Sequence, residues 1–134
     1  SSWLLAISLF VFLSLALVKR CAELELLKSE NKQLAQGRGY QTSDLPYLVA
    51  MGVSSGFMAV LVLALYADSQ NGNLLYSNPK LLWCICPVLL YWLMRVWILT
   101  SRRQLVDDPV HFALNDRLSW LCLALIGLVA WAAR

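Results

Sequence analysis

The sequence predicts an all-α membrane protein, a polytopic helix bundle with four transmembrane helices. One reason is composition: hydrophobic residues make up 60% of the 134 residues and charged residues only 14%, with a mean hydropathy of +0.62. Soluble domains carry about 25% charged residues. A soluble protein of this size could not bury so much apolar surface, so its main solvent must be lipid. The other reason is that the apolar residues fall into four long runs separated by polar segments.

All four runs belong to one transmembrane domain, which covers residues 1–134. The first run ends at the basic pair Lys19-Arg20, which marks a membrane interface. Good helix formers dominate residues 21–35, so we expect this helix to continue out of the bilayer as an amphipathic segment. The predicted spans are about 3–18, 46–67, 81–100 and 118–133.

The second and third spans carry local signals of their own. Ser43 or Asp44 is expected to cap the second helix, with Pro46 in its first turn. The small residues of Gly52-Val-Ser-Ser-Gly56 predict a helix face that meets protein rather than lipid. In the third span Pro87 is a candidate kink. Arg95, near the end of that span, is expected to snorkel or to face a polar cavity.

Topology follows from the basic residues. The segments 19–44 and 101–117 carry most of them, whereas the intervening loop carries only Lys80. The positive-inside rule therefore predicts that both charged segments are cytoplasmic.

Several site types are disfavoured by the sequence. Cys84 and Cys86 lie two residues apart on a predicted helix, too close for an easy disulfide, and no histidine or carboxylate accompanies this pair as a zinc ligand. There is no glycine-rich phosphate loop or nucleophile elbow. Nothing suggests nucleic-acid binding. The spans contain few ionisable groups apart from Arg95, which argues against an ion pathway.

The two charged segments would bring cations and carboxylates to one membrane surface. Arginine and lysine hold phosphate oxygens, and carboxylates hold magnesium that bridges to phosphate, so this mixture suits a phosphorylated substrate. Simpler readings stay open. Lys19 and Arg20 are also typical topology anchors, and Lys19 and Glu23 are four residues apart and could simply pair. Asp107-Asp108-Pro109 could be a turn before a short helix, and Asp116-Arg117 a cap and anchor.

Three stretches give the chain a family resemblance. They are Lys19-Arg20-Cys21-Ala22-Glu23-Leu24, Gly37-Arg38-Gly39-Tyr40, and the run from Asp107-Asp108-Pro109 to Asp116-Arg117. Their order and spacing across four spans resemble the C-terminal half of the UbiA family of intramembrane prenyltransferases. The nearest branch is similar to decaprenyl-phosphate phosphoribosyltransferase.

The resemblance implies a nine-helix bundle in the bacterial inner membrane, of which these spans would be the last four. Family members bind Mg²⁺ and a donor diphosphate at two polar motifs on the cytoplasmic side. Lys19, Arg20, Arg38 and Tyr40 would then contact substrate phosphate, and Glu23 would be a metal ligand. This chain departs from most of the family, because Lys19, Arg20 and Glu23 stand where two aspartates are usual. The first aspartate-rich motif would lie in a missing N-terminal half.

The resemblance thus implies a magnesium-dependent transferase that moves a prenyl or phosphoribosyl group from a diphosphate donor to an acceptor such as polyprenyl phosphate. Its partners would be the bilayer, an isoprenoid lipid substrate and the N-terminal half of the same protein. The alternative is a non-catalytic multi-span subunit or scaffold, whose charged segments serve as anchors and docking surfaces.

Overall fold

The computed structural model describes residues 2–29, 41–69, 79–104 and 109–133, and their architecture is helical throughout. No β-strand is present in those ranges. Two short 3₁₀ helices precede the second and third long helices. The elements are α1 (Ser2–Ser29), η1 (Thr42–Asp44), α2 (Leu45–Ala67), η2 (Pro79–Cys84), α4 (Ile85–Ser101), α5 (Pro109–Asn115) and α6 (Arg117–Ala133).

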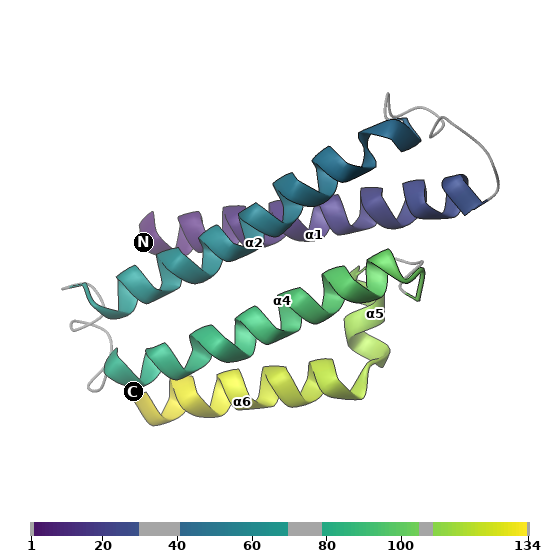
Figure 1. Cartoon of the computed structure of the whole chain (residues 1–134). Coiled ribbons are helices and arrows are strands. Elements are labelled where there is room, and N and C mark those ends of the chain that lie inside the picture. The colour runs from purple at the N-terminus through teal and green to yellow at the C-terminus, as the bar shows by residue number, and fades with distance from the viewer. Residues whose placement is uncertain (1, 30–40, 70–78, 105–108, 134) are drawn as a thin grey trace.

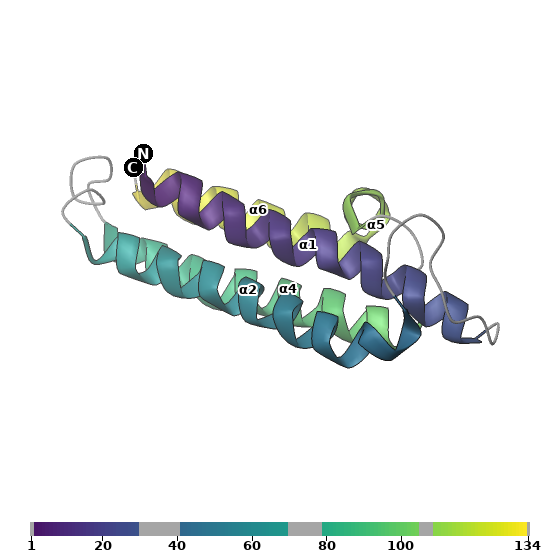
Figure 2. The ribbon, with the colours of Figure 1, turned by 90° about the horizontal axis from the view of Figure 1, so that it is seen from above.

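The four long helices lie side by side and alternate in direction (Figures 1 and 2). The α2 helix packs on α1, while α4 contacts α1, α2 and α6. The short helix α5 runs across the long axes beside the end of α4, and both chain termini lie at the opposite end of the bundle (Figure 1). The parts of the two charged segments that the structure describes therefore meet at one end.

Three helical segments are long and apolar enough to cross a membrane: Ser2–Lys28, Thr42–Ala67 and Lys80–Ser101. The fourth predicted span corresponds to α6, which is apolar but shorter, with 17 residues. Large hydrophobic side chains cover the outside of the bundle; Leu5 is 72% exposed and Trp131 is 73% exposed. Such a surface suits lipid and would be a liability in water. The protein is therefore an all-helical integral membrane protein.

The small-residue face of α2 meets protein, as predicted. Gly52, Ser55 and Gly56 are buried. A Cβ atom added at Gly52 would lie 2.2 Å from the Trp97 ring, and one at Gly56 would lie 3.1 Å from Ser14 Oγ. Glycine at these positions thus lets α2 approach α1 and α4 closely.

A buried polar contact joins the same three helices. Ser14 Oγ of α1 donates to the Gly52 carbonyl oxygen of α2 (2.7 Å), and Trp97 Nε1 of α4 donates to Ser14 Oγ (3.1 Å). We call these three residues the Ser14 junction. Because lipid offers no competing water, each of these polar groups needs a protein partner, and each has one.

The helix ends refine the predictions. The α1 helix continues without a break through the charged stretch to Ser29, as expected for a helix that leaves the bilayer. Asp44 occupies the position before α2, but its Oδ2 accepts the backbone N–H of Gln41 (2.9 Å) rather than an N–H of α2. Pro87 lies in the first turn of α4, directly after η2. Proline is tolerated in the first turn of an α-helix, and a bend at Pro87 in the helical run Lys80–Ser101 stays a prediction.

Two clusters of buried residues hold the ends of the bundle. The one at the charged end joins α1, α2 and α4 and contains Val18, Cys21, Ala22, Leu24, Leu45, Leu48, Val96 and Trp97. The other lies at the end that holds the termini and includes Tyr66, Leu82 and Ala133. All four cysteines are free. The charged residues at the charged end of the bundle are therefore held in place by a cluster of buried apolar residues.

Candidate functional site at the charged end of the bundle

In the stretch Lys19–Leu24, one side of the helix is buried and the other is exposed. Cys21, Ala22 and Leu24 are buried in the cluster at the charged end, whereas the Lys19 side chain is exposed. Helical periodicity explains the division, because residues three and four apart share a face. The polar face is thus anchored to α2 and α4 through its own apolar neighbours.

Arg20 and Glu23 lie together on that polar face. Arg20 Nη1 donates to Glu23 Oε2 at 3.0 Å, and the two side chains are 22% and 33% exposed. The pair places a guanidinium beside a carboxylate at the point where α1 leaves its apolar stretch. These are the two group types that the sequence assigned to phosphate and to metal.

A second ion pair joins the two charged segments. Arg103 Nε, just beyond α4, lies 3.6 Å from Glu25 Oε2 of α1. Arg103 has a positive φ of 63°. Arg103 follows the C-cap residue of α4, Arg102. The Arg103 N–H donates to the Thr100 carbonyl oxygen (3.1 Å), and the Gln104 N–H donates to the Leu99 carbonyl oxygen (2.9 Å). This is a Schellman ending, with arginine in the place that glycine usually takes.

Some of the predicted site lies outside the described residues. This applies to Arg38 and Tyr40, the expected helpers in phosphate binding, and to Asp107 and Asp108. In the part of the chain that is described, no group of three or more His, Cys, Asp or Glu side chains is placed to hold a metal ion. Glu23 as a magnesium ligand therefore stays a prediction, as does substrate phosphate contact by Lys19 and Arg20.

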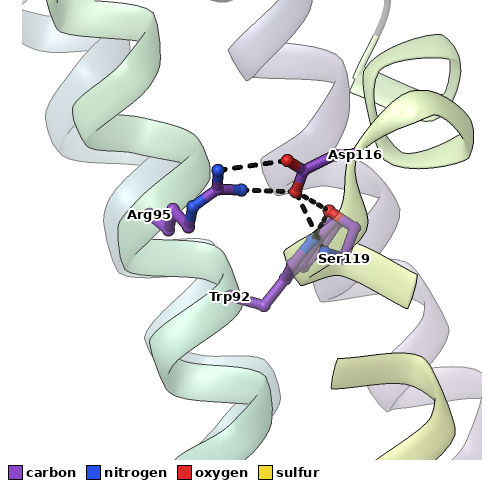
Figure 3. A network of polar contacts seen from close by, with 4 residues as sticks. All are labelled: Trp92, Arg95, Asp116 and Ser119. Atoms are coloured by element: carbon purple, nitrogen blue, oxygen red, sulfur yellow. Dashed lines mark hydrogen bonds and ion pairs between the residues drawn. The ribbon is translucent and has the colours of Figure 1, made fainter. Parts of the chain in front are cut away.

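A further polar cluster at this end centres on Arg95 and Asp116 (Figure 3). Arg95 donates through Nη1 to Asp116 Oδ2 (2.5 Å) and through Nη2 to Asp116 Oδ1 (3.1 Å). Both side chains are largely buried, at 21% and 14% exposure. The Phe112 ring of α5 covers the guanidinium, with 5.6 Å between Cζ and the ring centroid. A bidentate pair of this kind fixes both the distance and the orientation of α4 and α6.

Asp116 also begins α6. Its Oδ2 accepts the Ser119 backbone N–H (2.9 Å) and the Ser119 hydroxyl (2.7 Å), so it caps the helix in the usual way. Trp92 Nε1 of α4 donates to Ser119 Oγ (2.8 Å). We call Trp92, Arg95, Asp116 and Ser119 the Arg95–Asp116 network.

The environment of Asp116 changes its acidity. Burial acts to raise the pKa of this carboxyl group, but the hydrogen bonds from Arg95 and Ser119 outweigh burial and hold the pKa below its usual value. Asp116 is therefore a stable anion at neutral pH, which suits a structural counter-ion better than a proton carrier.

The sequence identified Arg95 and Asp116 separately but not as partners. The sequence predicts a cap at Asp116 and a polar environment for Arg95, and in the structure Asp116 caps α6 through Ser119 and also pairs with Arg95. Two signals in the sequence could have predicted this pairing. One is the Asp-x-x-Ser pattern at a helix start, and the other is the need of an arginine in an apolar helix for a nearby anion.

An apolar hollow of about 230 Å³ lies beside the network, between α4, α5 and α6. Trp92 and Ser119 belong both to its wall and to the network. The other residues that line it are Leu89, Ala113, Leu114, Trp120, Cys122, Leu123 and Ile126. A hydrocarbon chain therefore has a place next to the polar end of the bundle.

Comparison with known proteins gives two bacterial relatives. Over 128 residues the chain is 39% identical to "Uncharacterized protein y4nM" of Sinorhizobium fredii. That alignment covers 95% of this chain and 25% of the relative. Over 129 residues the chain is 30% identical to "Nodulation protein NoeC" of Azorhizobium caulinodans. That alignment covers 92% of this chain and 40% of the relative. The chain thus spans a quarter to two-fifths of the length of these relatives. No family model matches the chain, and no solved structure matches it.

Proposed function

We propose that this chain is the C-terminal part of a membrane-embedded transferase of the UbiA type. In this proposal α6 crosses the membrane as the fourth span, and the four spans complete a nine-helix bundle in the bacterial inner membrane. The charged end faces the cytoplasm. The reaction moves a prenyl or phosphoribosyl group from a diphosphate donor to an acceptor such as polyprenyl phosphate, with Mg²⁺.

One observation carries the proposal: two charged segments about 80 residues apart converge at one end of an apolar bundle. The Glu25–Arg103 pair joins them, and the Arg20–Glu23 pair lies on the same helix as Glu25. A diphosphate needs cations, and its magnesium needs carboxylate oxygens. A lipid acceptor needs adjoining hydrocarbon, which the hollow between α4, α5 and α6 offers.

Each residue has a role in this proposal. Lys19 and Arg20 hold the donor phosphates, with Arg38 and Tyr40 in support, and they stabilise the negative charge of the departing diphosphate. Glu23 orients Arg20 through their ion pair and contributes to the magnesium site. Magnesium commonly takes only one or two protein carboxylates and completes its shell with phosphate and water. A lone glutamate next to a basic pair is compatible with that coordination.

The relatives supply context. Both are longer than this chain, which leaves room in those proteins for further spans and a second polar motif. The relative in Azorhizobium is named a nodulation protein, so we extend the proposal to a transferase that serves nodulation.

The test is an activity assay on the complete protein that contains this chain. The donors are polyprenyl diphosphate and phosphoribosyl diphosphate, the acceptor is polyprenyl phosphate, and each reaction is run with and without Mg²⁺. We expect product with one donor and only with magnesium. Lys19→Ala and Arg20→Ala are expected to lower turnover at least about tenfold, since each removes a charge-assisted phosphate contact.

Lys28→Ala is the matched control, because it removes the same charge from an exposed position on the same helix. Equal turnover in the Lys19, Arg20 and Lys28 variants would contradict the phosphate assignment. Absence of product with either donor would favour the alternative function, a non-catalytic membrane subunit. A specific observation supports that alternative: Arg95 and Arg103 each form an ion pair with a different helical segment, as expected if these charges only hold helices together.

A further inference from the structure

The outer face of α4 carries a hollow that the proposed reaction does not use. It measures about 340 Å³ and is lined by residues spaced three, four and seven apart, hence by one side of the helix. Two of the six are arginines, and the others are apolar or aromatic. They are Tyr91, Met94, Arg95, Ile98, Leu99 and Arg102.

A second hollow of about 220 Å³ adjoins the first between α2 and α4. Met94 and Ile98 line both hollows, so the two lie next to each other on the surface. The second is wholly apolar, and Val53 and Phe57 of α2 form its other wall. Together the two hollows offer cations near the charged end and hydrocarbon deeper in the bundle. This is the distribution of charge and hydrocarbon in a phospholipid.

The arginines remain able to bind an anion. Arg102 is exposed, and within the described residues it has no ion-pair partner. Arg95 gives two of its five N–H donors to Asp116, and its position is fixed by that pair and by Phe112. Asp116 balances the charge of Arg95, so among the described residues that line this hollow Arg102 adds one positive charge. A phosphodiester carries one negative charge.

We propose that this face of α4 binds an anionic phospholipid of the surrounding bilayer, with its phosphate at Arg102 and Arg95 and an acyl chain in the hollow between α2 and α4. Arg102 follows the last turn of α4, at the height where a headgroup lies if α4 spans the membrane. Met94 and Ile98 are 45% and 46% exposed, so a lipid chain reaches them without displacing protein. The bound lipid would hold α4 against α2 and so support the charged end.

The test is native mass spectrometry of the purified protein titrated with phosphatidylglycerol or phosphatidylcholine. We expect tighter binding of phosphatidylglycerol. Arg102→Gln is expected to weaken that binding roughly fivefold, the factor that corresponds to about 1 kcal/mol for one interfacial cation. Ile98→Trp fills both hollows and is expected to weaken binding of both lipids.

Arg117→Gln is the matched control, since it removes the same charge from an exposed position at the same end but outside both hollows. Equal weakening by Arg117→Gln and Arg102→Gln would overturn the proposal in favour of general attraction to the membrane. A photoreactive benzoylphenylalanine at position 98 gives a second readout. Crosslinks to phospholipid support the site, whereas crosslinks to protein mean that another helix covers this face.

Discussion

Two of the polar contacts between helices in the described part of the bundle are built in opposite ways. The Ser14 junction uses neutral groups, is fully buried and depends on glycine to bring three helices together. The Arg95–Asp116 network uses full charges, is partly exposed and lies where an apolar helix begins. Charge in lipid is tolerated only where a counter-ion and nearby water reduce its cost, whereas a hydroxyl can be satisfied at any depth. The position of each contact follows from this difference.

The largest expected effect tests the neutral contact. Gly52→Leu places a side chain where even a Cβ would lie 2.2 Å from the Trp97 ring. Overpacking a tight helix contact costs about 1–3 kcal/mol or more, so we expect a loss of unfolding free energy at the upper end of that range. Unfolding in a denaturing detergent measures it. Gly127→Leu is the control, because nothing lies within 4 Å of a Cβ at Gly127, and we expect almost no change there. Similar losses at the two positions would refute the close-packing account.

The second prediction tests the charged contact. Asp116→Ala removes the cap of α6 and leaves Arg95 without its anion, so we expect a loss of about 2 kcal/mol in unfolding free energy. Asp116→Asn keeps a capping group and is expected to lose about half as much. The exposed Asp68 at the other end serves as control, and Asp68→Ala should change stability by less than about 0.5 kcal/mol.

The same carboxylate predicts a pH dependence. Because the folded pKa of Asp116 lies below its unfolded value, its contribution is present above that unfolded value and is lost as pH falls through the folded pKa. Stability should therefore decline below about pH 4, where a free aspartate begins to protonate. Unfolding measured from pH 6 to pH 3 should show a shallower decline in Asp116→Asn. Identical pH profiles for the variant and the parent protein would argue that other carboxylates control acid stability.

The two contacts also show what the sequence could predict. Composition predicted a helical membrane protein, and the small residues of α2 predicted its protein-facing side. The Ser14–Trp97 contact could not be predicted, because its residues are 83 positions apart and a single serine in an apolar run has no periodic signal. Arg95 and Asp116 are 21 positions apart, on either side of the short helix α5, whose direction decides whether they meet.

The charged stretch of α1 was predictable in kind but not in detail. Continuation of the helix past Val18 followed from helix propensity. The ion pair between Glu23 and Arg20 did not, because residues at spacings of three and of four both lie near Glu23 and side-chain packing decides its contacts. The Glu25–Arg103 pair depends on how α4 ends, because the positive φ of Arg103 sets the direction of the chain there. A positive φ is usually signalled by glycine, so the sequence does not predict this ending.

A smaller effect is expected from the hydroxyl of the Ser14 junction. Ser14→Ala removes one hydrogen bond to the Gly52 carbonyl oxygen and leaves Trp97 Nε1 without its acceptor. Hydrogen bonds between membrane helices average about 0.6 kcal/mol, so losing two should cost about 1 kcal/mol. Ser54→Ala, an exposed change on α2, is the control. A cost above that of Asp116→Ala would reverse the ranking of the two contacts.

The smallest effect is expected at Arg103, where two terms oppose each other. Its positive φ costs an arginine about 1 kcal/mol relative to glycine. Its ion pair with Glu25 is long, at 3.6 Å, and the arginine side chain is 50% exposed. Such a pair contributes at most a few tenths of a kcal/mol to the unfolding free energy. Arg103→Gly should therefore raise the unfolding free energy by about 0.5 kcal/mol, whereas Arg103→Ala keeps the strain, loses the pair and should be the less stable of the two. If Arg103→Gly were instead less stable than the parent protein, the ion pair would outweigh the backbone strain, and the charged end would depend on its charges.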